Sequence, residues 1–425
     1  MPNAALMERR DRALGAGAAL FYRQPLHIVR GEGVYLYDAD GRRYVDMYNN
    51  VPCVGHAHPR VVEAMARQQA TLNVHSRYLH DGIVAFAERL VDLHGPAIES
   101  VVFSCSGTEA NEIALRMARF ATGRRGILCT DATYHGNNDM VGSLSDLGGR
   151  EVAAPDVAAF AFPQTFRPIA PDLTGEALTD AYLESLESAI QRLEASGAGV
   201  AALIVCSVFA NEGLPDVPPG FMARAGERVR AAGGLVIADE VQAGYGRCGQ
   251  WWGYGVTGFT PDIVVTGKPM GAGLPLAATA ASRALVEIFR RNTRYFNTFA
   301  SSPLQAAVGM AVLDVIEQEG LIENAATVGP ALKAALEARK HRWNAIGDVR
   351  GVGLFIGIEM VDADGRPDCE QAVEVVNRLK DLGFLTSNAG ADGNVVKIRP
   401  PLVFSRDDAD AFLVAFDAVV DDLRG

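Results

Sequence analysis

Two short apolar runs, Leu235-Val-Ile-Ala-Asp-Glu240 and Ile263-Val-Val-Thr-Gly-Lys268, indicate the fold class of this chain. Similar runs alternate with helical patterns through the middle of the sequence, at 101–104, 109–121, 126–129, 178–195, 200–205 and 220–232. Short continuous apolar strands that alternate with helices predict a mostly parallel sheet covered on both faces. We therefore expect an α/β protein.

The two ends of the chain have a different pattern from the middle. Residues 33–38 and 43–47 predict a β-hairpin that turns at Asp40-Gly41. After about residue 310, long helical patterns precede strand-like runs at 349–360 and 395–399. We expect a large domain at 61–310, a smaller α+β domain at 311–425, and an N-terminal segment at 1–60 that packs with the smaller domain.

Composition and charge argue against several classes of protein. The 425 residues include 51 Asp+Glu and 39 Lys+Arg, so the net charge is −12, which disfavours a nucleic-acid partner. No apolar run is long enough to predict a membrane span, and the first residues lack the apolar core of a signal peptide. Six scattered cysteines without a C-x-x-C pair favour reduced thiols over zinc ligands or disulfides. We expect a cytoplasmic enzyme with no metal site.

Charged residues end both of the runs quoted first. A carboxylate such as Asp239 at the end of a parallel strand faces the crevice where α/β proteins bind ligands, although Asp239 or Glu240 could equally cap a loop. Lys268 lies between an apolar strand and the glycine-rich turn 269–273. Exclusion of water there would lower its pKa and make the amine nucleophilic, whereas most lysines are simply solvated.

A third signal is Ser104-Cys-Ser-Gly-Thr-Glu-Ala-Asn111, between a predicted strand and a predicted helix. Small residues at 106–108 let backbone N–H groups approach an anion at the helix N-terminus, although Ser and Thr also serve as ordinary caps. A phosphate cradle, a strand-end carboxylate and a strand-end lysine together are what pyridoxal phosphate requires. The G-x-G-x-x-G match at 244–249 lacks a following helical pattern, so we reject a nicotinamide dinucleotide site.

In combination, these motifs resemble the class III aminotransferases of the fold-type I group. The resemblance spans essentially the whole chain and rests on an ordered series: S-G-T-E-A-N at 106–111, Tyr134-His-Gly136, D-E-V-Q at 239–242, Thr266-Gly-Lys268, and Asn297-Thr-Phe299 with Pro303. It implies a large, mostly parallel-sheet domain with a smaller α+β domain, pyridoxal 5'-phosphate as cofactor, and a homodimer with shared active sites.

The resemblance also implies individual roles. Lys268 would form the Schiff base, and Asp239 would keep the pyridine nitrogen of the cofactor protonated. Tyr134 and Val241 would cover the two faces of the ring, and Gln242 would reach the ring hydroxyl. The full cofactor-binding set implied in this way is Ser106, Gly107, Thr108, Tyr134, His135, Asp239, Val241, Gln242, Lys268 and, from the neighbouring subunit, Thr298.

Within the family, the likeness is to the branch that contains ethanolamine-phosphate phospho-lyase and borders on alanine–glyoxylate-type aminotransferases. Better-known ω-aminotransferases have an Arg where this chain has Lys397, and a gating Glu where it has Asn211, with Glu212 as a shifted substitute. Arg matches a carboxylate bidentately, whereas Lys is a point charge compatible with phosphate. The candidate substrate-binding residues are Tyr48, Asn50, Arg77, Asn211, Lys397 and Arg399.

Three reactions remain open at this level. Because amino transfer is the commonest reaction in the family, the resemblance favours transfer of an amino group from a small amine or amino acid to a keto acid or aldehyde. The second is elimination of ammonia and phosphate from ethanolamine phosphate or a similar phosphorylated amine, and the third is racemisation or epimerisation. The first two begin when Lys268 removes a proton from the amine-bearing carbon. A catalytically silent binding protein is disfavoured because Lys268, Asp239 and Gln242 are all present.

Overall fold

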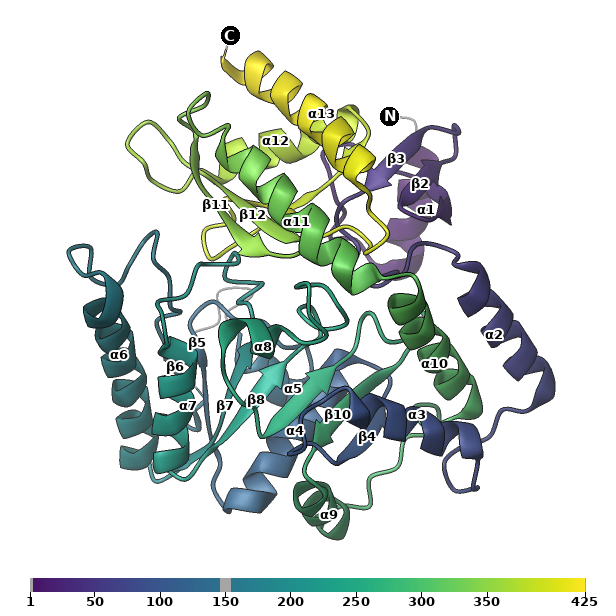
Figure 1. Cartoon of the computed structure of the whole chain (residues 1–425), viewed down its shortest axis with the longest axis vertical. Helices are drawn as coiled ribbons and strands as arrows, with labels where there is room; N and C mark the ends of the chain where they lie inside the picture. The colour runs from purple at the N-terminus through teal and green to yellow at the C-terminus, as the bar shows by residue number, and fades with distance from the viewer. Residues whose placement is uncertain (1–2, 146–153, 425) are drawn as a thin grey trace.

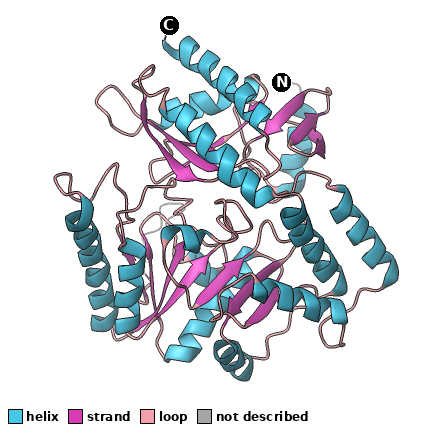
Figure 2. Cartoon of the chain, viewed as in Figure 1, coloured by secondary structure: helices cyan, strands magenta, loops and turns pink. Residues whose placement is uncertain are grey.

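The computed structural model describes residues 3–145 and 154–424, arranged as Figure 1 shows. A large part with a central sheet fills the lower half of that view, and a smaller part that contains both ends of the chain lies above it. Figure 2 shows the strands of the large part enclosed by helices. The predicted α/β fold with a mostly parallel sheet is therefore confirmed.

The central sheet has seven strands in the order β4-β10-β9-β8-β7-β5-β6. Neighbouring strands are parallel except at β10, which runs antiparallel to both β4 and β9. The bounds are Ser100–Ser104 (β4), Gly126–Thr130 (β5), Val157–Phe160 (β6), Val200–Cys206 (β7), Leu235–Asp239 (β8), Ile263–Thr266 (β9) and Ala277–Ala281 (β10).

Apolar runs in the sequence predict five of these strands but not β6 or β10. Both are rich in alanine, and β10 reads Ala277-Ala-Thr-Ala-Ala281. Alanine lacks the branched side chain that favours a strand, so only pairing with neighbours reveals these two. β7 is buried along its whole length, as expected for a strand covered on both faces.

Helices cover both faces of the central sheet. One apolar cluster joins α4, α5 and α9 to one face, and another joins α6 and α7 to the opposite face. The bounds are Gly107–Thr122 (α4), Asp139–Gly142 (α5), Gly175–Ala195 (α6), Phe221–Ala231 (α7), Gly253–Thr257 (α8) and Arg283–Asn292 (α9). The G-x-G-x-x-G match at 244–249 lies in turns, and no helix begins within it, which agrees with the rejected dinucleotide site.

Three further helices lie beside the β4 edge of the sheet and lead to the smaller part (Figure 1). They are α2 (Pro59–Thr71), α3 (Asp81–Asp92) and α10 (Pro303–Gln318). Residues of α10 belong to a core cluster that continues into the smaller part, so the two parts share apolar packing.

The smaller part contains two four-stranded sheets, β1-β2-β3-β13 and β11-β12-β15-β14. Their strands are Ile28–Glu32 (β1), Tyr35–Asp38 (β2), Arg43–Asp46 (β3), Ile346–Val352 (β11), Phe355–Met360 (β12), Phe384–Leu385 (β13), Ser387–Ala389 (β14) and Val395–Ile398 (β15). The helices are Ala4–Leu14 (α1), Leu321–Glu337 (α11), Cys369–Asp381 (α12) and Arg406–Arg424 (α13).

The N-terminal segment pairs directly with the C-terminal region. β2 and β3 form the antiparallel hairpin, and β3 pairs in parallel with β13 through Val45 and Phe384. The boundaries 1–60, 61–310 and 311–425 themselves stay a prediction.

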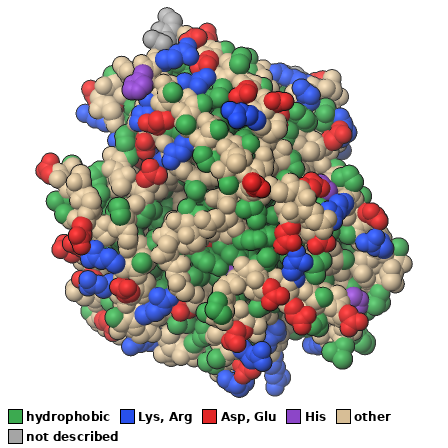
Figure 3. Space-filling model, in the orientation of Figure 1, with side chains coloured by type: hydrophobic (Ala, Val, Ile, Leu, Met, Phe, Trp, Pro, Cys, Tyr) green, Lys and Arg blue, Asp and Glu red, His purple; other side chains and the backbone are tan. Residues whose placement is uncertain are grey.

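Acidic and basic side chains are interspersed over the face drawn in Figure 3, and apolar side chains gather in the hollow between the two parts. Among the described residues, no helix combines the length and the apolar character needed to cross a membrane.

Candidate active site

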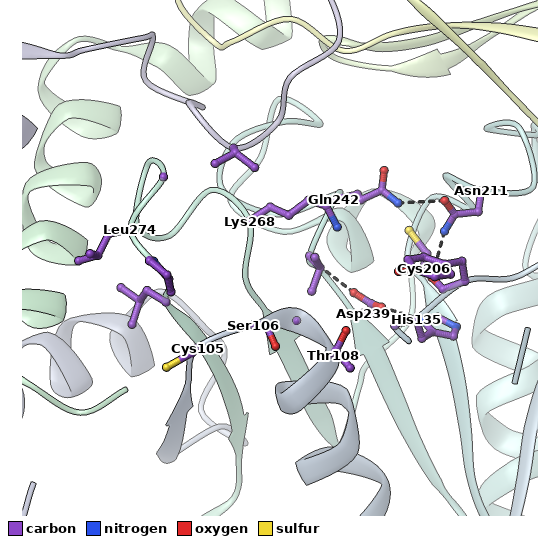
Figure 4. A pocket seen from close by; sticks show the side chains of 18 residues that line it. Cys105, Ser106, Thr108, His135, Cys206, Asn211, Asp239, Gln242, Lys268 and Leu274 are labelled. Carbon is purple, nitrogen blue, oxygen red and sulfur yellow. Dashed lines mark hydrogen bonds and ion pairs between the residues drawn. The ribbon is translucent and has the colours of Figure 1, made fainter. Parts of the chain in front are cut away.

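A cavity of about 290 Å³ lies at the carboxyl ends of β8 and β9 (Figure 4). This is the edge of a parallel sheet at which α/β proteins bind ligands. Lys268 and Asp239 both point into the cavity, and Ser106 and Thr108 lie at the N-terminal end of α4 beside them. The lining residues are Val51, Cys105, Ser106, Gly107, Thr108, Tyr134, His135, Gly136, Cys206, Asn211, Asp239, Val241, Gln242, Lys268, Gly273, Leu274, Pro275 and Leu276.

Asp239 is held by three hydrogen-bond donors. Its Oδ2 accepts from His135 Nδ1 at 2.7 Å and from Asn111 Nδ2 at 2.9 Å, and its Oδ1 accepts from the Val241 N–H at 2.9 Å. Burial by itself raises the pKa of Asp239, but these donors outweigh it and bring the pKa below its ordinary value. The carboxylate is therefore ionised inside the cavity.

His135 and Asn111 orient this carboxylate from behind. His135 Nε2 also pairs with Thr133 Oγ1 at 2.7 Å. Because an ionised carboxylate can only accept a hydrogen bond, the proton between His135 and Asp239 is assigned to Nδ1. The sequence predicts His135 as a site residue but not Asn111, which lies in the Ser104–Asn111 motif without standing out there. Asn111 is on α4 and Asp239 on β8, so only the packing of helix on sheet brings them together.

Lys268 enters the cavity from the loop after β9. Its side chain is accessible through the cavity, yet the surrounding protein excludes enough water to lower its pKa below the ordinary value. Arg399 lowers the pKa further, and Asp239 opposes this change. A lowered pKa makes the unprotonated, nucleophilic amine more abundant at neutral pH.

The N-terminus of α4 is capped and also has the features of an anion-binding cradle. Ser106 Oγ accepts from the Glu109 N–H at 3.2 Å, and Glu109 reaches back to the Cys105 N–H at 2.8 Å. The N–H groups of Gly107 and Thr108 belong to the first turn, which has no intrahelical partners, and both residues line the cavity. The helix dipole favours an anion at this position.

Two glycines keep the cradle narrow. A Cβ on Gly107 would lie 2.9 Å from Val241 Cγ2, and a Cβ on Gly136 would lie 2.6 Å from Thr108 Oγ1. Gly136 also has a φ of +146°, which disfavours other residues. A phosphate cradle, an ionised carboxylate and an activated lysine amine around one cavity fit pyridoxal phosphate.

Gln242 links the cavity to its surroundings. Its Nε2 donates to Asn211 Oδ1 at 3.2 Å, and Asn211 Nδ2 donates to the Tyr134 carbonyl at 3.1 Å. The buried Asn50 donates to the Gln242 carbonyl at 3.1 Å. These polar contacts hold the loops that follow β5, β7 and β8 in a fixed relation.

Lys397 and Arg399 lie immediately behind Gln242 and do not line the cavity themselves. Gln242 Oε1 accepts from Lys397 Nζ at 3.4 Å and from Arg399 Nη1. Lys397 Nζ also donates to the Ala210 carbonyl at 2.8 Å, and Arg399 Nε to the Tyr48 carbonyl at 3.0 Å. Burial lowers the pKa of both side chains, and Arg399 lowers that of Lys397 further.

Two acidic residues near the site have other partners. Glu240 accepts from Ser207 Oγ at 2.5 Å and from the Gly253 and Tyr254 N–H groups at 2.8 Å, so it caps α8. Burial raises its pKa to about 7. Glu212 accepts from Thr130 Oγ1, and burial raises its pKa as well.

Besides Asn50, Lys397 and Arg399, three further residues predicted from the sequence lie outside the lining of this cavity. Arg77 is exposed, with its guanidinium carbon 4.0 Å from the centre of the Phe296 ring. Thr298 is exposed in the loop before α10. Tyr48 packs beside Arg399, 5.0 Å from ring centre to guanidinium carbon.

Comparison with known proteins agrees with this geometry. The family model described as "Aminotransferase class-III" matches residues 20–420. A Drosophila melanogaster protein named alanine–glyoxylate aminotransferase 2-like is 40% identical, covering 96% of this chain and 85% of that protein. A Caenorhabditis elegans protein named ethanolamine-phosphate phospho-lyase homolog 1 is 34% identical, covering 98% and 93% respectively.

A solved structure is similar over its whole length. It is a phospholyase from Arthrobacter in complex with phosphoethanolamine, with a TM-score of 0.94, 40% identity, and coverage of 98% of this chain and 99% of that one. The chain belongs to the class III aminotransferase family of pyridoxal-phosphate-dependent enzymes.

Proposed function

We propose that this enzyme eliminates ammonia and phosphate from a phosphorylated amine, with ethanolamine phosphate as the first candidate. The observation that carries the proposal is the pair Lys397 and Arg399. Among the described residues, every hydrogen bond from these two side chains goes to a neutral carbonyl or carboxamide oxygen. Two buried basic groups without a carboxylate partner favour an anionic ligand, because an anion relieves their mutual repulsion and stabilises their charged forms.

Among the described residues, no carboxylate forms a hydrogen bond with Lys397 or Arg399, and this supports a substrate that always carries an anionic group. An aminotransferase that alternates between acidic and uncharged substrates needs a carboxylate that pairs with its cation when no anion is bound. Asn211 stands at that position and donates to Tyr134, while Glu212 is turned to Thr130. The basic end would therefore stay available to a phosphate in every turnover.

The residues of the chain have distinct proposed tasks. When bound, pyridoxal phosphate supplies an electron sink for the bond broken at the amine-bearing carbon. Gly107 and Thr108 would hold the cofactor phosphate through their N–H groups, and Asp239 would hold the proton on the ring nitrogen. Lys268 Nζ would bind the cofactor and then take the proton from the amine-bearing carbon.

The proposed reaction needs one substrate and water. As Lys268 takes the proton, the C–O bond to the phosphate breaks and its electron pair leaves with the phosphate group. Water then replaces the nitrogen, so ethanolamine phosphate yields acetaldehyde, ammonia and inorganic phosphate. Lys397 and Arg399, which lie behind Gln242, would bind the departing phosphate and stabilise its charge as it leaves.

The test is incubation with ethanolamine phosphate and no keto acid, followed by assays of phosphate and ammonia. Equal release of both supports the proposal. Lys397→Met is expected to raise KM for this substrate, whereas Lys340→Met, which removes a lysine paired with Glu337 at the surface, serves as the matched control. No release by wild-type enzyme, with acceptor-dependent turnover of an amine, would refute the lyase.

Amino transfer is the second candidate. Arg399 could grip a carboxylate bidentately, and the Drosophila relative named as an aminotransferase-like protein is as similar as the Arthrobacter phospholyase. Pyruvate or glyoxylate would then be required for turnover.

We further propose a homodimer in which Thr298 completes the site of the partner. Thr298 and Phe299 are exposed in the single chain, and Leu79 is fully exposed on the loop before α3. Exposed apolar side chains of this kind are typical of protein interfaces. Light scattering that returns a monomer mass would refute the dimer. A cytoplasmic location stays a prediction.

A further inference from the structure

A fully buried carboxylate outside the cavity organises the segment that follows β3. Asp46 ends this strand and accepts four hydrogen bonds. Its Oδ1 accepts from the N–H groups of Tyr48 at 3.0 Å and Asn49 at 2.9 Å. Its Oδ2 accepts from Asn49 Nδ2 at 3.0 Å and pairs with His56 Nε2 at 2.7 Å. The turn after β3 therefore depends on this one side chain.

The turn held by Asp46 bears directly on Arg399. The Met47 carbonyl accepts from the Arg399 backbone N–H at 2.7 Å, and the Tyr48 carbonyl accepts from Arg399 Nε at 3.0 Å. The Tyr48 ring also packs beside the guanidinium. Both the backbone and the side chain of Arg399 are thus positioned by the two residues that follow Asp46.

The same segment continues to the cofactor end of the site. Asn50 Nδ2 donates to the carbonyl of Gln242, and Val51 lines the cavity. Cys53 Sγ donates to the carbonyl of Pro269, the residue after Lys268, at 3.4 Å. One segment therefore contacts the two loops that carry Gln242 and Lys268 as well as Arg399.

The charge of Asp46 also acts on Arg399. Burial lowers the pKa of Arg399, and the nearby Asp46 carboxylate opposes that change. The two residues contact one another through the turn and not through an ion pair. Asp46 can consequently support the charge of Arg399 while leaving its guanidinium available to a ligand.

We propose that Asp46 is a positioning residue that sets the affinity of the site for the anionic end of the substrate, acting through the Met47 and Tyr48 carbonyls on Arg399. This inference rests on the proposed function, because it assigns the anion to Arg399. Asp46 does not contact Lys268, so we expect a change at Asp46 to alter substrate affinity and not the proton transfer at Lys268.

The test compares Asp46→Asn with Asp38→Asn in the holoenzyme. Asp38 ends β2 and also caps a turn, accepting from the N–H groups of Asp40 and Arg42 and from the Tyr44 hydroxyl, but its strand does not lead into the site. Both variants remove one negative charge from the same small sheet, so they match in charge and in capping role.

For Asp46→Asn we expect KM for ethanolamine phosphate to rise about tenfold, the loss typical of a charge-assisted hydrogen bond, with kcat within about twofold of wild type. Asp38→Asn should leave both constants unchanged. His56→Ala removes the half-buried imidazole that pairs with Asp46 Oδ2 and leaves Asp46 in place. This variant should therefore also raise KM, but by less than Asp46→Asn. It keeps the inference testable if Asp46→Asn does not fold.

Calorimetric titration with inorganic phosphate gives a readout independent of turnover. Weaker binding by Asp46→Asn and His56→Ala than by Asp38→Asn supports the inference. Equal phosphate affinity in all three variants, or a fall in kcat with KM unchanged, would overturn it while leaving the proposed lyase intact. Wild-type enzyme that neither binds phosphate nor releases it from ethanolamine phosphate would overturn both.

Discussion

Gly107→Ala tests whether the N-terminus of α4 holds the cofactor phosphate. The added Cβ would lie 2.9 Å from Val241 Cγ2 and 3.1 Å from Cγ1, well inside ordinary carbon–carbon contact at about 3.5 Å. Either Val241 or the first turn of α4 must shift, and overpacking of this kind costs about 1–3 kcal/mol. Since both neighbours line the cavity, the cost should fall on cofactor binding and weaken it about 5- to 150-fold.

The folded apo-protein should change little, because Val241 and the first turn of α4 border the cavity and can shift toward it. The assay is titration of apo-protein with pyridoxal phosphate, followed by visible absorbance, alongside thermal unfolding without cofactor. Gly95→Ala is the matched control, because its Cβ would meet nothing within 4 Å. Wild-type cofactor affinity in a folded Gly107→Ala protein would refute the assignment of the cradle.

Three further outcomes are expected. Lys268→Ala should abolish the visible absorption band of the bound cofactor, while a colourless wild type that cannot be reconstituted would contradict the enzyme assignment. Burial raises the pKa of Glu240 from 4.5 to about 7, so between these pH values the folded protein holds a proton that the unfolded chain releases. Stability should fall as pH rises through that window by up to about 3 kcal/mol, and Glu240→Gln should remove this difference in chemical denaturation at pH 5 and pH 8. Finally, mixing Lys268→Ala subunits with Thr298→Asp subunits should restore activity that neither variant shows alone, because each hybrid dimer contains one site with both native residues; persistent inactivity in verified hybrids would contradict a shared site.

Most residues at the cofactor end of the site could be predicted from the sequence, because they lie at the ends of strands that the sequence locates. Apolar runs locate β8 and β9, and parallel strands bring their carboxyl ends to one edge of the sheet. Asp239 and Lys268 therefore had to lie near one another, and the Ser106–Thr108 turn had to open a helix beside them. Local pattern and sheet geometry suffice for this part, and the family match agrees with it.

A capping carboxylate and a ligand-binding carboxylate look alike in the sequence at the end of β8. Asp239 and Glu240 are adjacent, and the strand pattern by itself allows either carboxyl group to be a loop cap or a ligand-binding group. Packing then gives Asp239 three donors and a place in the cavity, while Glu240 is buried against the start of α8. Side-chain direction at a strand end depends on which neighbours pack against it, and those neighbours are distant in the chain.

By itself, the sequence determined the α/β class, the cofactor chemistry and the residues at the strand ends, since these follow from periodicity and short-range spacing. Only the tertiary structure decided which residues lie at the end of the site where we propose that the substrate anion binds. There Lys397 and Arg399 meet Gln242 more than 150 residues away in the chain. Met47 and Tyr48, in the turn held by Asp46, contact Arg399 from the opposite end of the chain. No local pattern encodes such meetings, because they arise when the two ends of the chain pack together over the large domain and exclude water from the groups between them.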